Sequence, residues 1–187
     1  MATVITERIG RLLLIGLNRP DRSNCIDRST AKLLHRIVSE DFEKDPSILG
    51  GVLYGEGIDF CTGIDLEELH RLGPDCLKCL PMMDMGTHRL PTMIGLSRAL
   101  DLALTGRSLT ANEALSFGLV NRVAKVGTAV GVAVQMMDSL CRLPGHEALM
   151  ADREALLQNS AQAMFPSSQA HEQWLNAYRA LANETET

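Results

Sequence analysis

A short apolar strand and an acidic helix start are joined by the sequence Gly57-Ile58-Asp59-Phe60-Cys61-Thr62-Gly63-Ile64-Asp65-Leu66. The residues before it, 48–54, are rich in β-forming side chains and predict a short buried strand. The residues after it, 66–72, predict a short helix that starts at Asp65, where the helix dipole favours negative charge. A glycine at such a junction lets a backbone N–H point toward a cleft, and an N–H so placed can stabilise a developing oxyanion.

The residues upstream of this junction predict a β-hairpin followed by a helix. Residues 3–7 and 11–17 are rich in β-forming side chains on either side of a glycine turn. Asp27 or Ser29 is expected to cap the helix, which ends before Pro46. Its apolar residues recur at the spacing of one buried helix face: Leu33, Leu34, Ile37, Val38 and Phe42.

The second half of the chain has a mainly helical pattern. Thr110 and Glu113 are the two ends of a capping box, and Gly118 is expected to end the short helix that follows. Residues 119–123 predict a strand or an extended segment. Longer helical patterns cover residues 94–104, 128–142, 146–159 and 168–182. Strands therefore come first and helices last, which indicates an α/β or α+β globular domain.

Composition and charge exclude several classes of protein. The 187 residues include 18 basic and 23 acidic side chains, and the net charge of −5 argues against a nucleic-acid-binding surface. The hydrophobic content of 45% indicates a globular core rather than a disordered chain. No apolar run approaches the about 20 residues that cross a bilayer, and the N-terminus resembles no signal peptide. We therefore expect a cytoplasmic protein without membrane or nucleic-acid partners.

The cysteines offer one alternative chemistry. An odd count of five without a signal peptide indicates reduced thiols. Cys76 and Cys79 form a CxxC pair flanked by His70 and His88, so a zinc site or a redox pair is a remote alternative. The histidine spacing matches no common zinc pattern, and two ordinary thiols in a loop are the simpler interpretation. We therefore expect no metal.

Several segments resemble, in their order along the chain, the motifs of one enzyme family. They are Leu17-Asn18-Arg19-Pro20 with Arg22-Ser23-Asn24-Cys25, Phe60-Cys61-Thr62-Gly63-Ile64-Asp65-Leu66, Thr87-His88-Arg89-Leu90-Pro91, Leu104-Thr105-Gly106-Arg107 with Ala111-Asn112-Glu113-Ala114, and Gly118-Leu119-Val120-Asn121-Arg122-Val123. The sequence resembles the crotonase superfamily, which contains the enoyl-CoA hydratases and isomerases. The resemblance covers residues 3–72 and 87–158, and the ordered set is far more specific than any single motif.

This resemblance implies a fold, a ligand and an assembly. The fold would be of the α/β class, an abbreviated crotonase-like ββα spiral core over residues 1–125 with a helical C-terminal region over residues 126–187. The ligand would be an acyl-CoA thioester, with no cofactor apart from the CoA that is part of the substrate. The chain would form a homo-oligomer, a trimer or a hexamer. Members of the family stabilise an enolate in an oxyanion hole made of two backbone N–H groups.

The family motifs also imply which residues form the site. By matching position, Ile64 would supply the first N–H of the oxyanion hole and would be the one catalytic group. Arg22 would meet a CoA phosphate, or else be a solvated arginine in a turn. The substrate-binding residues implied by the resemblance are Arg22, Ser23, Asn24, Ile64, Asp65, Leu66 and Glu67.

The chain departs from the family pattern between Leu72 and Thr87, where it has only 14 residues. The family has there a glycine-rich stretch, further strands and both catalytic carboxylates, and the shortening falls near residues 71–80. Hydration of an enoyl thioester needs an acid and a base close to the reacting atoms, so we expect weak or no hydratase activity.

Two interpretations of this departure stay open. The first is an enzyme in which other side chains replace the missing carboxylates, the candidates being Glu67, Glu68, His70 and Asp84. The second is a non-catalytic shortened isoform or paralogue that acts through CoA binding or through subunit assembly.

Overall fold

The computed structural model describes residues 2–72 and 86–164, which belong to two compact units. The first unit combines residues 1–80 with 125–146, and the second combines residues 81–124 with 147–187. The two units therefore alternate along the chain. Helix α6 (Ala129–Cys141) belongs to the first unit because it packs on the sheet of that unit.

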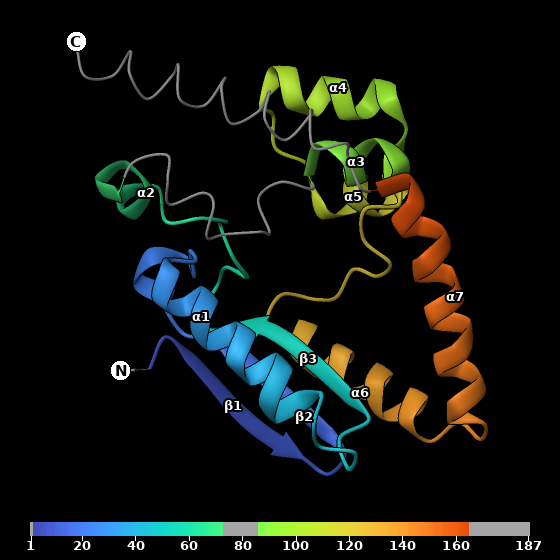
Figure 1. Ribbon diagram of the computed structural model, residues 1–187. Coiled ribbons are helices and arrows are strands. Elements are labelled where there is room, and N and C mark those ends of the chain that lie inside the picture. The colour runs from blue at the N-terminus through green and yellow to red at the C-terminus, as the bar shows by residue number, and fades with distance from the viewer. Residues whose placement is uncertain (1, 73–85, 165–187) are drawn as a thin grey trace. The chain divides into compact units, whose positions relative to one another are not determined.

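The first unit contains a mixed three-stranded sheet in the order β1-β2-β3 (Figure 1). β1 (Val4–Ile9) and β2 (Leu12–Leu17) pair as an antiparallel hairpin, and β3 (Gly50–Gly55) pairs with β2 in parallel. The predicted hairpin and the predicted strand after it are thus confirmed. The predicted α/β class is also confirmed, because helices accompany this sheet on both faces.

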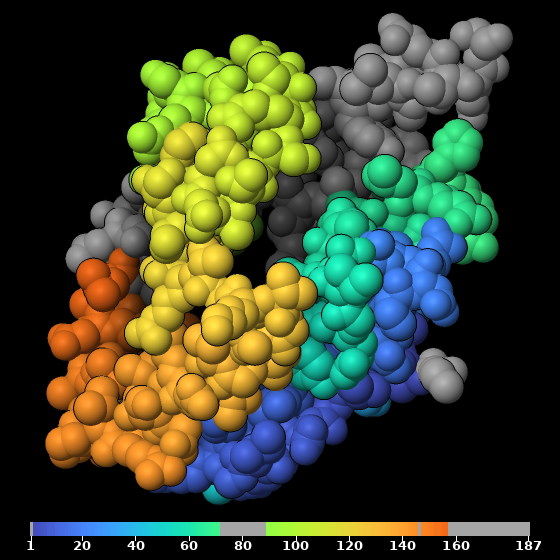
Figure 2. All heavy atoms as spheres, turned by 180° about the vertical axis from the view of Figure 1, so that it is seen from behind, coloured from blue at the N-terminus to red at the C-terminus, as the bar shows by residue number. Residues whose placement is uncertain are grey.

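β2 lies at the centre of the core, since all six of its residues are buried. Successive side chains of a strand point to opposite faces of the sheet, and each face is covered. Helix α1 (Arg28–Arg36) and its π-helical continuation, Ile37–Phe42, cover one face (Figure 1). α6 covers the other face, which is the one seen in Figure 2. The buried clusters are Val4, Leu13, Ile15, Leu17 and Ile37 under α1, and Leu12, Leu14 and Val52 under α6.

Two glycines in the strands make room for larger neighbours on the α6 face. A Cβ atom built on Gly16 would lie 2.6 Å from Cζ of Tyr54, and one built on Gly50 would collide with the methyl group of Met137. Glycine within a strand often marks such a close approach. These residues therefore let a tyrosine lie across β2 and let α6 approach β3.

The second unit contains the helices α3 (Gly86–Ile94), α4 (Leu96–Thr105), α5 (Ala111–Phe117) and most of α7 (His146–Met164). The helix predicted over residues 94–104 starts at Leu96, because Gly95 has a φ of 84°, outside helical geometry. Arg98 of α4 lies over the ring of Phe117 of α5, with 4.4 Å from its Cζ atom to the ring centroid, a cation–π contact between the two helices.

The predicted capping box is confirmed at the start of α5. The Thr110 hydroxyl accepts a hydrogen bond from the Glu113 amide at 3.2 Å, and the Glu113 carboxylate accepts one from the Thr110 amide at 2.9 Å. Gly118 ends this helix with a φ of 81°, as predicted. Residues 119–123 form no strand, so only the extended alternative remains.

Three of the sequence predictions fall outside the described residues, wholly or in part. The helix predicted over residues 168–182 and the CxxC pair Cys76 and Cys79 lie there, as does Asp84. Within the described ranges no helix is both long enough and apolar enough to cross a membrane, and no three His, Cys, Asp or Glu side chains are grouped as metal ligands would be.

Candidate functional site

β2 and β3 run in parallel, so their carboxyl ends lie at the same edge of the sheet. In open α/β sheets, ligands bind at that edge. The loop after β2 and the loop after β3 meet there in one isolated parallel bridge, between Ile26 and Ile64. The Ile26 amide donates to the Gly63 carbonyl at 2.7 Å, and the Asp65 amide donates to the Ile26 carbonyl at 3.0 Å.

The bridge decides where the amide of Ile64 points. Both of its hydrogen bonds use the N–H and the carbonyl of Ile26, so the N–H and the carbonyl of Ile64 point to the opposite side. Among the described residues, the Ile64 N–H has no hydrogen-bond partner. Gly63 has a φ of 95°, which favours glycine, although nothing lies within 4 Å of a Cβ built there. The backbone conformation, and not a lack of space, accounts for this glycine.

Asn24 joins the two loops through its side chain, which is 1% exposed. Its Nδ2 donates to the carbonyls of Glu56 at 2.8 Å and Asp59 at 2.7 Å, and its Oδ1 accepts from the Arg19 amide at 2.8 Å. Its φ of 54° is left-handed, a conformation that asparagine adopts more readily than most residues. Every polar atom of this amide has a hydrogen-bond partner in the protein, so Asn24 has a structural role in holding the two loops together.

Asp65, which directly follows Ile64, is a buried carboxylate between two arginines. Its Oδ2 lies 3.0 Å from Nη2 of Arg19, and its Oδ1 lies 3.1 Å from Nη2 of Arg22. It also accepts from the Glu68 amide at 3.2 Å and so caps α2 (Leu66–Leu72). Burial on its own would raise the pKa of Asp65, but the Glu68 amide and the two guanidinium groups outweigh it and hold the pKa below its ordinary value. The carboxylate is therefore ionised at neutral pH.

Asp27 is a second carboxylate at the same place. It caps α1, as the sequence allowed, by accepting from the Thr30 amide at 2.7 Å. Its Oδ2 lies 3.2 Å from Nη2 of Arg19. Burial would raise the pKa of Asp27, but the hydrogen bonds from Thr30 and Ser29 and the charge of Arg19 lower it overall.

Arg22 and Glu67 form the outer part of the cluster. Nη2 of Arg22 lies 2.5 Å from Oε2 of Glu67, and 44% of the Arg22 side chain and 77% of the Glu67 side chain are exposed. The hydrogen bond that Arg22 donates to Glu67 and the charges of Asp65 and Glu67 raise the pKa of Arg22. Glu68 lies deeper, where it accepts from the Arg28 amide at 2.7 Å.

The residues that the family motifs singled out therefore lie together at this edge. They are Arg22, Ser23, Asn24, Ile64, Asp65, Leu66 and Glu67. Ser23 takes part through its carbonyl, which accepts from the amide and the hydroxyl of Thr62, both at 3.2 Å. Leu66 is 72% exposed. The sequence analysis did not single out Arg19, although an arginine two residues after an apolar strand, together with the two acidic helix starts, was a signal.

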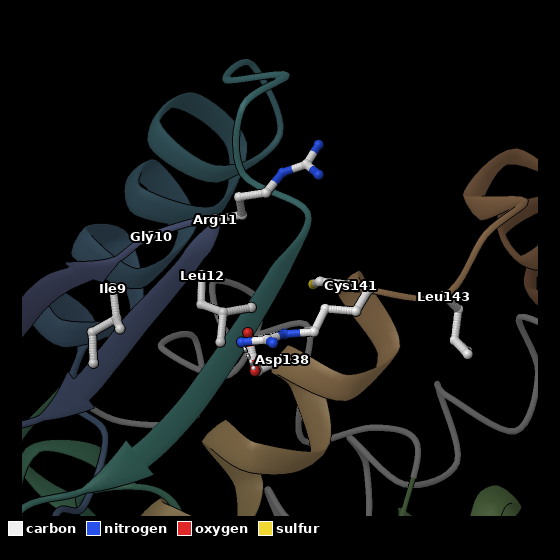
Figure 3. Close-up of a pocket in the computed structure, with 8 residues that line it drawn as sticks. Ile9, Gly10, Arg11, Leu12, Asp138, Cys141 and Leu143 are labelled. Carbon is white, nitrogen blue, oxygen red and sulfur yellow. Dashed lines mark ion pairs between the residues drawn. The ribbon is translucent and has the colours of Figure 1, made fainter.

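A hollow that was not predicted lies at the opposite edge of the sheet. It has a volume of about 630 Å³ and lies between the β1–β2 turn and the carboxyl end of α6 (Figure 3). Its lining residues are Ile9, Gly10, Arg11, Leu12, Asp138, Cys141, Arg142 and Leu143. Among these lining residues, Arg142 forms an ion pair with Asp138 at 2.8 Å within α6.

Comparison with known proteins finds relatives among CoA-dependent hydratases, although no family model matches the chain. Mevalonyl-coenzyme A hydratase sidH of Aspergillus fumigatus is 25% identical over 188 residues, which cover 70% of this chain and 69% of that protein. The short-chain-enoyl-CoA hydratase of Clostridium acetobutylicum is 22% identical over 195 residues, covering 73% of this chain and 74% of that protein. A fatty acid oxidation complex subunit alpha of Vibrio cholerae is 32% identical over 118 residues, or 62% of this chain and 16% of that protein.

Each of the first two alignments spans more positions than the number of residues of this chain that it includes. The alignment with the Aspergillus protein runs over 188 residues, yet it uses 70% of a chain of 187. The alignment with the Clostridium protein runs over 195 residues and uses 73%. Both relatives therefore have residues inside the aligned region that this chain does not match.

Solved structures share the fold. The enoyl-CoA hydratase of Mycobacterium tuberculosis superimposes with a TM-score of 0.73 at 21% identity, covering 98% of this chain and 97% of that one. The enoyl-CoA hydratase of Mycobacterium smegmatis gives a TM-score of 0.74 at 19% identity, with 98% of both chains covered. The chain therefore shares its fold with these enoyl-CoA hydratases, and its most similar sequences include hydratases that act on CoA compounds.

Proposed function

We propose that the chain binds an acyl-CoA thioester at the carboxyl edge of the sheet, where the Ile64 N–H donates a hydrogen bond to the thioester carbonyl. The observation that carries this proposal is the Ile64 N–H itself, which has no hydrogen-bond partner among the described residues and points away from the bridge. A backbone donor held in place before the ligand arrives needs no reorganisation when charge develops on the carbonyl oxygen.

Weak or absent hydratase activity is part of the same proposal. The catalytic carboxylates and the second backbone donor of the family have no counterpart in the sequence motifs, and the sequence relatives have internal residues that this chain does not match. The loss of one oxyanion donor typically costs about 3–4 kcal/mol of transition-state stabilisation. A site with one donor and no base therefore leaves little catalysis of hydration.

The carboxylates close to Ile64 are engaged in the structure. Glu67 pairs with Arg22, and Glu68 accepts from the Arg28 amide. A general base must reach within about 3 Å of the proton it abstracts, so either group would have to leave its partner first. His70, the remaining candidate among the described residues, is an exposed side chain of α2.

The CoA moiety would lie along the segment that contains Arg22, Ser23 and Asn24. Of the three, Arg22 offers a partly exposed guanidinium that can meet a phosphate of CoA. We further propose that the chain acts in the cytoplasm as a homo-oligomer, a trimer or a hexamer, with no cofactor and no metal. The alternative is a non-catalytic shortened isoform or paralogue that acts through CoA binding or subunit assembly, and the unmatched internal residues of the relatives favour it over a full enzyme.

Two measurements test the proposal. We expect acetoacetyl-CoA at millimolar concentration to raise the unfolding temperature, because a ligand that binds the folded state stabilises it. We expect hydration of crotonyl-CoA, followed by the loss of ultraviolet absorbance, to stay close to the buffer blank. The absence of any thermal shift contradicts CoA binding. Turnover well above the blank that disappears in Glu67→Gln or Glu68→Gln contradicts the weak-activity part.

Two matched variants test whether the Ile64 N–H donates to the thioester carbonyl. Ile64→Pro removes the N–H, and Ile64→Ala keeps the N–H while shortening the side chain. We expect the proline variant alone to lose the stabilisation by acetoacetyl-CoA, with circular dichroism confirming that both variants are folded. Equal stabilisation of the two variants shows that the carbonyl binds elsewhere.

A further inference from the structure

We propose that Arg19 is the positioning residue of this site: its buried guanidinium holds the bridge between Ile26 and Ile64 and thereby fixes the direction of the Ile64 N–H. The inference deepens the proposed function, since the orientation of this N–H matters for a thioester ligand. Arg19 would not touch the ligand itself.

Arg19 contacts the residue that follows each member of the bridge. Nη2 lies 3.0 Å from Oδ2 of Asp65 and 3.2 Å from Oδ2 of Asp27. Nη1 donates to the Cys25 carbonyl at 2.6 Å, on the other side of Ile26. The Arg19 side chain is only 15% exposed. One guanidinium therefore joins both loops directly beside the bridged residues.

The bridge itself is short, although hydrogen bonds of Asn24 and Thr62 also join the two loops. Two backbone hydrogen bonds form it, and it belongs to no strand ladder. Asp27 and Asp65 both contact the same nitrogen of Arg19, so their carboxylates lie close together, and like charges at close range repel. Without Arg19, Arg22 still pairs with Asp65, whereas Asp27 keeps no ion pair with any residue that the structure describes. The repulsion would then act across the bridge and push the two loops apart.

The fork of the guanidinium is what makes this contact possible. Its two terminal nitrogens serve three acceptors in different directions, and lysine offers a single nitrogen on a flexible stem. Arg19→Lys keeps the charge but cannot reach all three acceptors at once. It should therefore rescue the bridge only in part, whereas Arg19→Gln should lose it.

Amide hydrogen exchange tests the inference without any ligand. The Ile26 and Asp65 amides form the bridge, and we expect both to exchange about tenfold faster or more in Arg19→Gln. Amides of the β1–β2 ladder should stay within about twofold of the wild type. Arg8→Gln is the control, because Arg8 pairs with Asp45 at 3.0 Å and 47% of its side chain is exposed. Unchanged exchange at Ile26 and Asp65, or equal acceleration of the ladder amides, overturns the inference. If Arg19→Gln does not fold, Arg19→Lys decides the question by the same criterion.

A second measurement links the positioning to the ligand. The measurement is the infrared spectrum of an acyl-CoA labelled with ¹³C at the thioester carbonyl. The stretching band of this carbonyl should lie at lower wavenumber when the ligand is bound to the wild type, because a hydrogen bond polarises the carbonyl. We expect Arg19→Gln to lose this displacement while binding unacylated CoA within about threefold of the wild type. A displacement that persists in Arg19→Gln contradicts the inference. If the wild type binds no acyl-CoA, the proposed function fails, while the exchange experiment still decides whether Arg19 holds the bridge.

Discussion

The two edges of the sheet contain the same kinds of charged residue but use them differently. At the carboxyl edge, Asp65 and Arg19 have side chains that are 5% and 15% exposed, and their bonds join separate loops. At the amino edge, Asp138 and Arg142 are 48% and 78% exposed and pair within one helix. Burial gives a charged side chain few alternatives to its partner, whereas an exposed pair competes with water. The charged side chains at the carboxyl edge therefore hold two loops of the backbone together, whereas those at the amino edge form an exposed pair within a single helix.

The largest effect should come from removing the buried carboxylate. Asp65→Ala leaves Arg19 and Arg22 with one partner fewer and uncaps α2, and we expect a loss of about 3 kcal/mol in the free energy of unfolding, as is typical for breaking a buried pair. Urea denaturation measures it. A loss below about 1 kcal/mol would place Asp65 with the exposed pairs instead.

The next effect should come from Asn24. Asn24→Ala removes three hydrogen bonds and leaves the carbonyls of Glu56 and Asp59 without this donor. We expect a loss of about 2 kcal/mol, because an unsatisfied buried polar group costs about 1–3 kcal/mol. Asn18→Ala is the control, since Asn18 donates its Nδ2 in an exposed contact to the Ala2 carbonyl. Equal losses in the two variants would remove the distinction between buried and exposed amides.

Acid should weaken the carboxyl edge. Asp27 and Asp65 have pKa values lowered by folding, so the stability they contribute is present above the ordinary aspartate pKa of about 3.9 and is lost as the pH falls through the lowered values. Urea midpoints measured at neutral pH and down to about pH 3 should fall with acid. The double variant Asp27→Asn with Asp65→Asn should be less stable at neutral pH and should show a shallower decline. A decline of unchanged slope would assign the acid sensitivity to other groups.

The smallest effect should come from the amino edge. Asp138→Ala breaks an exposed pair of α6, and we expect the free energy of unfolding to change by less than about 0.5 kcal/mol. The same urea experiment measures it. A loss as large as that of Asp65→Ala would show that the two edges depend equally on their charges.

Local sequence signals predicted the elements that depend on a few adjacent residues. The hairpin on either side of Gly10, the Asp27 cap and the Thr110–Glu113 capping box all follow from backbone chemistry within about one turn of chain. The helix predicted from residue 94 starts two residues later, at Leu96. The spacing of apolar residues carries no information about the φ of Gly95, which lies outside helical geometry. Periodicity reports which face is buried, and not where the backbone leaves helical geometry.

The surface on which α6 packs could not be predicted in the same way. α6 has the composition of an ordinary C-terminal helix, but it completes the core over Leu12, Leu14 and Val52. Apolar packing is non-directional, so a helix pattern does not state which distant surface will cover it. The alternation of the two units is a consequence of that packing.

In the candidate site, too, some features follow from the sequence and others depend on tertiary structure. The turn from Gly57 to Leu66 and the start of α2 at Asp65 follow from the order of residues alone, because a glycine and a helix cap act locally. The role of Arg19 depends on tertiary structure, since its partners Asp27 and Asp65 lie 8 and 46 positions away along the chain. A guanidinium recognises acceptors by direction and distance in space, and only the parallel arrangement of β2 and β3 brings those acceptors together.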